Sequence, residues 1–253
     1  MKALAVIPAR YASTRFPGKP LAMLGGKPVI QWVWDSLSAV EELAAAVVAT
    51  DDERIVKAVE QFGGRAMMTS SAHRSGTDRC GEVLRRLEEA GEHYDVVVNV
   101  QGDEPFTRRS QIQSLIACFA NAGTQIATLK TAVRSTEELL SPNNVKVICA
   151  EGGRAVYFSR QPIPYLRGAA VENWLERQPY YKHIGIYAFR AETLKEVVQL
   201  KPSPLEVSES LEQLRWLENG YAIQVRETES ANIGIDTPAD LAEAERHLTD
   251  NLA

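Results

Sequence analysis

Residues 6–20 read VIPARYASTRFPGKP and follow a short apolar run that ends at Ile7. An amphipathic pattern begins just after them, so the segment is predicted to be a loop between a strand and a helix. In α/β proteins such loops line the carboxyl edge of the sheet, where ligands bind. The loop carries Arg10, Arg15 and Lys19, and no acidic residue occurs before Asp35. This pattern favours a site for a polyanion such as a nucleoside triphosphate, and a solvated basic loop is the alternative.

Two common phosphate-binding motifs are missing from the sequence. It contains neither Gly-x4-Gly-Lys-Ser/Thr nor a Gly-x-Gly-x-x-Gly that follows a strand. A P-loop NTPase and a classical dinucleotide-binding oxidoreductase are therefore disfavoured.

The composition is close to that of an average globular protein. The chain has 253 residues, 45% of them hydrophobic, which fits a single domain over 1–253. The net charge of −5 argues against a nucleic-acid partner. Cys80, Cys118 and Cys149 are far apart among apolar neighbours and are interpreted as buried thiols in a reducing compartment. No apolar run approaches the length of a membrane span, so we expect a cytoplasmic protein without membrane insertion.

Strand and helix patterns alternate through the first half of the chain. The valine-rich stretch 95–100 is the clearest buried strand, as expected in the middle of a parallel sheet. The alternation predicts an α/β fold with a Rossmann-like, doubly wound, mostly parallel sheet. Shorter strand patterns at 126–133, 145–149 and 183–189 predict a smaller β-rich lobe, inserted at about 130–200.

Ser75, Gly76 and Arg79 lie where a strand is expected to lead into the next helix. A small residue and a glycine allow close approach to the backbone at a helix N-terminus, which carries a partial positive charge. A capped turn with no ligand explains the same residues.

Acidic residues follow two predicted strands. Asp103 comes after the valine strand, next to Gln101 and a glycine, and Asp236 precedes Thr237, the expected N-cap of the last helix. Carboxylates at the same sheet edge as a cationic loop are suited to hold a hard metal ion for phosphate chemistry. A solvated turn or a favourable helix-dipole contact is the alternative for each of them.

Polar side chains of the second half also gather near predicted strand ends. Arg160 is able to bind a carboxylate with two hydrogen bonds, and His183 and Tyr187 share one face of a strand. Glu212 and Gln213 flank the apolar stripe of a helix. A surface ion pair, a satisfied core edge and ordinary boundary residues are the corresponding structural explanations.

Taken in order, these motifs resemble a known family. Arg10-x4-Arg15-Phe-Pro-Gly-Lys19-Pro resembles the signature of sugar-activating cytidylyltransferases. The segments around residues 75–79, 101–105, 157–164, 182–187, 209–215 and 232–240 extend the resemblance to the CMP-Kdo synthetases (3-deoxy-manno-octulosonate cytidylyltransferases), a branch of the sugar nucleotidyltransferases. It covers nearly the whole chain. Phe16 and Lys182 depart from the frequent Leu and Arg, and the free-form loop 166–178 leaves a lid role open.

This resemblance implies a function and a set of site residues. It implies transfer of CMP from CTP to 3-deoxy-D-manno-octulosonate (Kdo), with release of pyrophosphate, for lipopolysaccharide biosynthesis. It also implies a fold of the nucleotide-diphospho-sugar transferase type, a homodimer and a sugar-binding and dimerisation role for the 130–200 lobe. The expected catalytic residues are Lys19, Arg10, Asp103 and Asp236. The expected nucleotide-binding residues are Ala9, Arg10, Arg15, Lys19, Ser75, Gly76, Arg79 and Gln101. The expected sugar-binding residues are Gln101, Arg160, His183, Tyr187, Glu212 and Gln213. Mg²⁺ is the expected cofactor, with Asp103 and Asp236 as its ligands.

Other readings stay open on the sequence alone. The acceptor could be sialic acid or 8-amino-Kdo, and a nucleotide-binding sensor without catalysis is the alternative from another class.

Overall fold

The computed structural model describes residues 1–229 and 234–252 of the chain. Its centre is a nine-stranded sheet in the order β11-β7-β10-β6-β1-β4-β5, with β8 joined to β10 and β9 to β8. The strands are β1 (Ala3–Ala9), β4 (Leu43–Thr50), β5 (Ala66–Met68), β6 (Val96–Asn99), β7 (Ile126–Ala132), β8 (Lys146–Cys149), β9 (Ala155–Ser159), β10 (Tyr181–Arg190) and β11 (Ile223–Glu227), and a separate hairpin is formed by β2 (Met23–Leu24) and β3 (Lys27–Pro28). The α-helices are α1 (Val29–Ser38), α2 (Glu53–Gln61), α3 (Gly76–Glu89), α4 (Arg109–Ala117), α5 (Thr136–Leu140), α6 (Trp174–Arg177), α7 (Ala191–Val197), α8 (Pro204–Glu209), α9 (Glu212–Glu218) and α10 (Pro238–Leu252), with 3₁₀ turns η1 (Lys19–Leu21), η2 (Cys118–Ala120), η3 (Glu151–Gly153) and η4 (Val171–Asn173).

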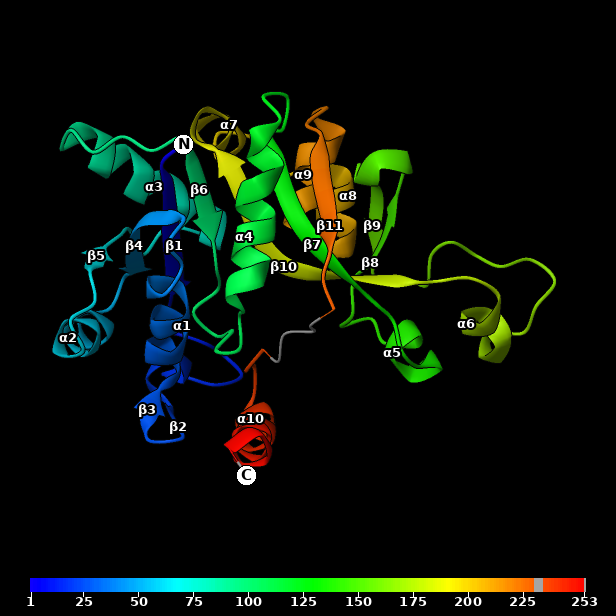
Figure 1. Cartoon of the computed structure of the whole chain (residues 1–253), viewed down its shortest axis with the longest axis horizontal. Coiled ribbons are helices and arrows are strands. Elements are labelled where there is room, and N and C mark those ends of the chain that lie inside the picture. Colours follow the sequence, from blue (N-terminus) through cyan, green and yellow to red (C-terminus); the bar gives the residue numbers. More distant parts are fainter. Residues whose placement is uncertain (230–233, 253) are drawn as a thin grey trace.

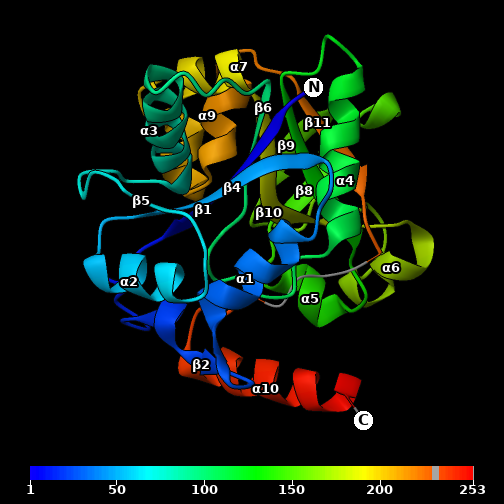
Figure 2. The same cartoon turned by 60° about the vertical axis from the view of Figure 1, so that its left-hand side comes forward.

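Strand β1 lies inside the sheet and is buried on both faces. Leu4 and Val6 point into the core shared with α3, α7 and α9, whereas Ala5 and Ile7 point into the core shared with α1, α2 and α4. This alternation follows from the two-residue period of a strand. The result is a three-layer arrangement, with helices covering both sides of the sheet (Figures 1 and 2). The predicted α/β fold is confirmed.

One central strand runs against its neighbours. β1, β4, β5 and β6 pair in parallel, but β10 pairs antiparallel with both β6 and β7. β10 starts at the edge where the parallel strands end, and its Tyr187 lies opposite Asn99, the last residue of β6. The second half of the chain thereby brings polar residues to the carboxyl edge of the first half.

The segment between β7 and β10 extends to one side of the sheet. It contains β8, β9, α5 and α6, and Figure 1 shows α5 and α6 beyond the end of the sheet. Trp174 and Tyr180 pack there with Leu139 and Val133 in a small separate core. The role of a 130–200 lobe in sugar binding and dimerisation stays a prediction.

Helix α10 returns to the N-terminal part of the molecule (Figure 2). Ala244 and Ile235 pack there with Leu24 and Val29, and Phe16 borders this cluster. Within the described part of the chain, no helix has both the length and the apolar character that a membrane span requires.

Candidate active site

A cavity of about 410 Å³ opens at the carboxyl edge of the sheet, above the ends of β1 and β6. Its walls come from four places in the sequence: the end of β1 with the loop that follows it, the start of α3, the turn after β6 and the segment just before α10. Nine of the predicted site residues line it: Ala9, Arg10, Arg15, Lys19, Gly76, Arg79, Gln101, Asp103 and Asp236. The structure thus brings the predicted cations and the predicted carboxylates together in one cavity.

Lys19 lies between the two predicted metal ligands. Its ammonium donates to Asp103 and, over 3.0 Å, to Oδ1 of Asp236. Arg15 approaches the other oxygen of Asp236 at 3.1 Å. The Lys19 side chain is only 11% exposed, whereas Asp103 is 29% and Asp236 50% exposed, so the ammonium is buried and its partners stay partly open to water. Two carboxylates that come from residues 133 positions apart (236 − 103) therefore converge on one cation.

This arrangement keeps Lys19 positively charged. Burial by itself lowers the pKa of an ammonium, but Asp103 and Asp236 more than offset it and raise the pKa of Lys19 above 10.5. At neutral pH the cavity therefore offers a fixed cation next to Arg10 and Arg15.

The two carboxylates also have the chemistry that Mg²⁺ requires. In the part of the chain that is described, no group of three or more His, Cys, Asp or Glu side chains gathers for a metal. Mg²⁺ commonly takes one or two protein carboxylates and completes its shell with water and substrate phosphates. Asp103 and Asp236 already share one cation, so this donor set fits such an ion.

Two glycines allow the walls of the cavity to approach closely. A Cβ atom on Gly102 would lie 2.9 Å from the carbonyl oxygen of Pro8, so the turn after β6 sits against the end of β1 only with glycine there. A Cβ atom on Gly76 would lie 3.1 Å from Nε2 of Gln101. The start of α3 is therefore fitted closely to the cavity.

The cationic loop is tethered to the neighbouring helix α2. The Gly18 amide donates to the Tyr11 carbonyl over 2.9 Å and closes the loop. The Arg54 guanidinium stacks 3.3 Å from the centre of the Tyr11 ring, and Asp52 holds Arg54 with two hydrogen bonds of 2.9 and 2.6 Å.

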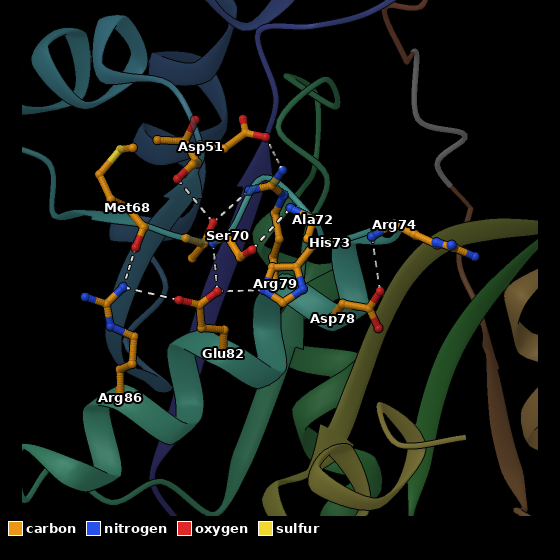
Figure 3. A network of polar contacts seen from close by, with 12 residues as sticks. Asp51, Met68, Ser70, Ala72, His73, Arg74, Asp78, Arg79, Glu82 and Arg86 are labelled. Carbon is orange, nitrogen blue, oxygen red and sulfur yellow. Dashed lines mark hydrogen bonds and ion pairs between the residues drawn. The ribbon is translucent and has the colours of Figure 1, made fainter. Parts of the chain in front are cut away.

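Arg79 reaches the cavity as part of a buried ion pair. Its guanidinium donates to Asp51 over 2.6 Å and to Thr69 over 2.7 Å, and its side chain is 1% exposed (Figure 3). Ser75, the residue just before α3, is the N-cap of that helix and forms a capping box with Asp78. The capped turn expected as the alternative for Ser75 is therefore present, and the half-buried Gly76 that follows it lies in the wall of the cavity.

Sequence reasoning missed Asp51 and Thr69. Each follows a parallel strand, Asp51 after β4 and Thr69 after β5, and that position was the available signal. Their contacts with Arg79 depend on the order of the strands, which periodicity does not show.

A second polar group lies behind the first turn of α3. Thr77 donates to Glu212 over 2.7 Å, and a cavity of about 510 Å³ opens beside Ser75 and Glu212. The rings of His183 and Tyr187 are 5.2 Å apart, as their shared strand face predicts. Neither His183 nor Tyr187 lines the cavity around Lys19 or this second cavity.

Burial shifts the pKa values of His183, Tyr187 and Glu212. It lowers the pKa of His183 to about 3, so the ring is neutral, and Nε2 lies 2.8 Å from Oγ1 of Thr128. Burial also raises the pKa of Glu212, and it raises that of Tyr187 well above 10, with Glu212 adding to the effect. The buried Tyr187 hydroxyl has no hydrogen-bond partner among the described residues. An unpaired buried hydroxyl costs free energy.

Arg160 and Gln213 do not line the cavity that contains Arg10, Arg15 and Lys19, which we call the cation cavity. The Arg160 guanidinium donates to the backbone carbonyls of Glu209, Pro142 and Ser210, at 2.7, 2.9 and 3.3 Å. It therefore joins the end of β9 to the end of α8. Gln213 is buried on α9, next to Glu212.

Comparison with known proteins identifies close relatives. A family model described as Cytidylyltransferase matches residues 4–228. The 3-deoxy-manno-octulosonate cytidylyltransferase of Parabacteroides distasonis is 55% identical over 248 residues, which cover 96% of this chain and 97% of that protein. The enzyme with the same name from Phocaeicola vulgatus is 55% identical and covers 98% of both chains.

A solved structure supports the same relationship. The structure of CMP:2-keto-3-deoxy-manno-octonic acid synthetase complexed with CTP superposes with a TM-score of 0.91 at 42% identity, over 99% of this chain and 100% of that one. The match spans the whole fold, including the reversed strand β10.

Proposed function

Because this chain belongs to the cytidylyltransferase family, with 3-deoxy-manno-octulosonate cytidylyltransferases among its relatives, we propose that it activates 3-deoxy-manno-octulosonate with CTP. The products are CMP-3-deoxy-manno-octulosonate and pyrophosphate. The observation that supports this most directly is the cavity in which Lys19, Asp103 and Asp236 meet beside Arg10 and Arg15.

The reaction is one substitution at phosphorus. The anomeric hydroxyl oxygen of the sugar acid forms a bond to the α-phosphorus of CTP, and the bond from that phosphorus to the bridging oxygen breaks. Pyrophosphate leaves with the electron pair, and the hydroxyl proton passes to solvent or to a phosphate oxygen. Most of the barrier comes from positioning and from charge on the phosphates, so catalysis depends on fixed cations.

Lys19, Arg10 and Arg15 supply those cations in the proposal. With CTP bound, Lys19 and Arg15 exchange carboxylate partners for phosphate oxygens, which stabilises the charge that develops on pyrophosphate. Asp103 and Asp236 are then free to hold Mg²⁺. Such an ion would neutralise phosphate charge and make the sugar hydroxyl more acidic.

In this proposal the nucleoside fills the rest of the cavity and the sugar acid lies next to it. Ala9, Ser75, Gly76, Arg79 and Gln101 bind the nucleoside end in this proposal.

The sugar acid is assigned to Gln101, His183, Tyr187, Glu212 and Gln213. The Tyr187 hydroxyl, unpaired among the described residues, and the buried Glu212 carboxyl support this assignment.

Arg160 is the sixth proposed sugar ligand. It would have to exchange at least one backbone carbonyl for the sugar carboxylate. A homodimer and a cytoplasmic location complete the proposal.

Pyrophosphate release tests the function. The assay uses CTP, Mg²⁺ and one acceptor at a time: 3-deoxy-manno-octulosonate, its 8-amino analogue or N-acetylneuraminate. We expect release with the first acceptor, loss of activity with EDTA, recovery with excess Mg²⁺ and little activity when UTP replaces CTP. Faster turnover of another acceptor would change the assigned substrate. If CTP binds but no pyrophosphate is released with any of these acceptors, the chain is a nucleotide-binding protein without this activity.

A further inference from the structure

The loop 69–75 between β5 and α3 leads directly into the wall of the active-site cavity. It contains neither helix nor strand, and Ser70, Ala72 and Arg74 are exposed. Its last residue precedes Gly76, whose Cα region fits closely against Gln101 and Pro8. A loop of this kind keeps one conformation only if side chains elsewhere hold it.

Those side chains come from one face of α3. Asp78 accepts hydrogen bonds from the amides of Ser75 and Arg74, at 3.2 and 3.3 Å, and Arg79 donates to Thr69. Both ends of the loop are therefore tied to the first turn of the helix.

The middle of the loop depends on Glu82. One oxygen, Oε2, accepts a hydrogen bond from the Ser70 amide over 2.9 Å and lies 2.6 Å from Nε2 of His73 (Figure 3). The other oxygen accepts from Arg86 over 3.3 Å, and Arg86 also donates to the Met68 carbonyl just before the loop. The Glu82 side chain is 16% exposed, so water competes weakly for these contacts. Glu82 thus contacts both halves of the loop directly, and it is linked through Arg86 to Met68, the residue before the loop.

We propose that Glu82 is a positioning residue for nucleotide binding, because it holds loop 69–75 on α3 and thereby fixes the nucleoside end of the cavity. The residue does not line the cation cavity and acts through the loop. The inference rests on the proposed function for its kinetic readout, while its binding readout needs CTP alone.

The test compares three variants of the full chain. Glu82→Ala removes the contacts of Glu82 with Ser70 and His73, and Glu82→Gln keeps a carbonyl oxygen for the Ser70 amide. Glu88→Ala is the matched control, since Glu88 lies on the same helix and its 23% exposed side chain pairs with Lys195 on α7 and not with a loop residue.

The readouts are KM for CTP, kcat, the Kd for CTP without sugar, and the melting temperature. We expect Glu82→Ala to raise the KM and Kd for CTP about tenfold, with kcat within about twofold of the unmodified protein. Glu82→Gln should recover most of this loss, and Glu88→Ala should bind CTP normally. Trypsin should cut after Arg74 faster in Glu82→Ala, and CTP should slow the cut less than in the unmodified protein.

Two results would overturn the proposal. One is unchanged CTP binding in Glu82→Ala, whatever its melting temperature. The other is an equal loss of CTP affinity in Glu88→Ala, which would show a general effect of weakening α3. If no acceptor supports turnover in the unmodified protein, the proposed function fails, and the CTP titrations still decide the role of Glu82.

Discussion

Replacing Lys19 with methionine tests the centre of the site. Methionine keeps most of the length of the side chain and removes the ammonium that joins Asp103 to Asp236. Asp103 then loses the ammonium beside it, whereas Asp236 keeps Arg15 at 3.1 Å. Both stability and catalysis should respond, and the structure indicates how much.

The stability loss follows from burial. Breaking a fully buried ion pair costs roughly 3–5 kcal/mol. Here the Asp103 side chain is 29% exposed and Asp236 is 50% exposed, so solvent screens part of the repulsion. We therefore expect a loss of about 2 kcal/mol, or about 4–8 °C in melting temperature for a chain of this size.

Catalysis should fall much further. Lys19 is proposed to stabilise charge that develops on pyrophosphate, and removal of one such group commonly costs about 100- to 1,000-fold in kcat. Pyrophosphate release measures this loss at saturating CTP.

Mg²⁺ separates the two effects. In Lys19→Met the freed carboxylates should bind Mg²⁺ more tightly, so millimolar Mg²⁺ should raise the melting temperature more than in the unmodified protein. Lys27→Met is the control, because Lys27 forms an exposed ion pair with Asp35 outside the cavity. Activity within tenfold of normal in Lys19→Met, or no added stabilisation by Mg²⁺, would refute the assigned roles.

Three further changes test other parts of the structure. His183 is neutral in the fold with a pKa of about 3, so below pH 6.5 the unfolded chain binds a proton that the folded chain does not. The free energy of unfolding therefore decreases as the pH is lowered, by up to about 1.4 kcal/mol per pH unit. His183→Phe should reduce this slope between pH 4.5 and 6.5 in urea titrations; an unchanged slope would contradict the burial argument. Gly76→Ala places a methyl group 3.1 Å from Gln101 and should raise the KM for CTP about tenfold, a prediction that normal CTP kinetics would exclude. Arg54→Ala should raise the KM for CTP about two- to fivefold at an unchanged melting temperature, whereas Tyr11→Phe keeps the stacked ring and should behave normally; equal CTP kinetics in Arg54→Ala would rule out the tether.

Local patterns in the sequence predicted much of this molecule. The valine run before Gln101 marked the buried strand β6, and the run ending at Ile7 marked β1. The turn chemistry at Thr237 also holds, since its hydroxyl accepts a hydrogen bond from the Asp240 amide. These features depend on side-chain spacing and on neighbouring residues, which a sequence shows directly.

The tertiary structure alone decided which distant residues meet. β10 lies between β6 and β7 in the reverse direction, and no local pattern specifies that neighbour. Arg160 looked like a free anion ligand, yet its donors satisfy backbone carbonyls where two elements end.

The centre of the site shows the same division. The sequence indicated that Lys19, Asp103 and Asp236 carry the chemistry, because charged residues follow buried strands. Lys19 contacts Asp103, 84 residues away in the sequence, and Asp236, 217 residues away. Only the packing of the sheet and of α10 brings these side chains within hydrogen-bond distance. Residue type and spacing thus determined the local elements and the candidate chemistry. The order of the strands determined which distant residues contact one another. That order depends on the packing energy of the whole fold, which no local stretch of sequence contains.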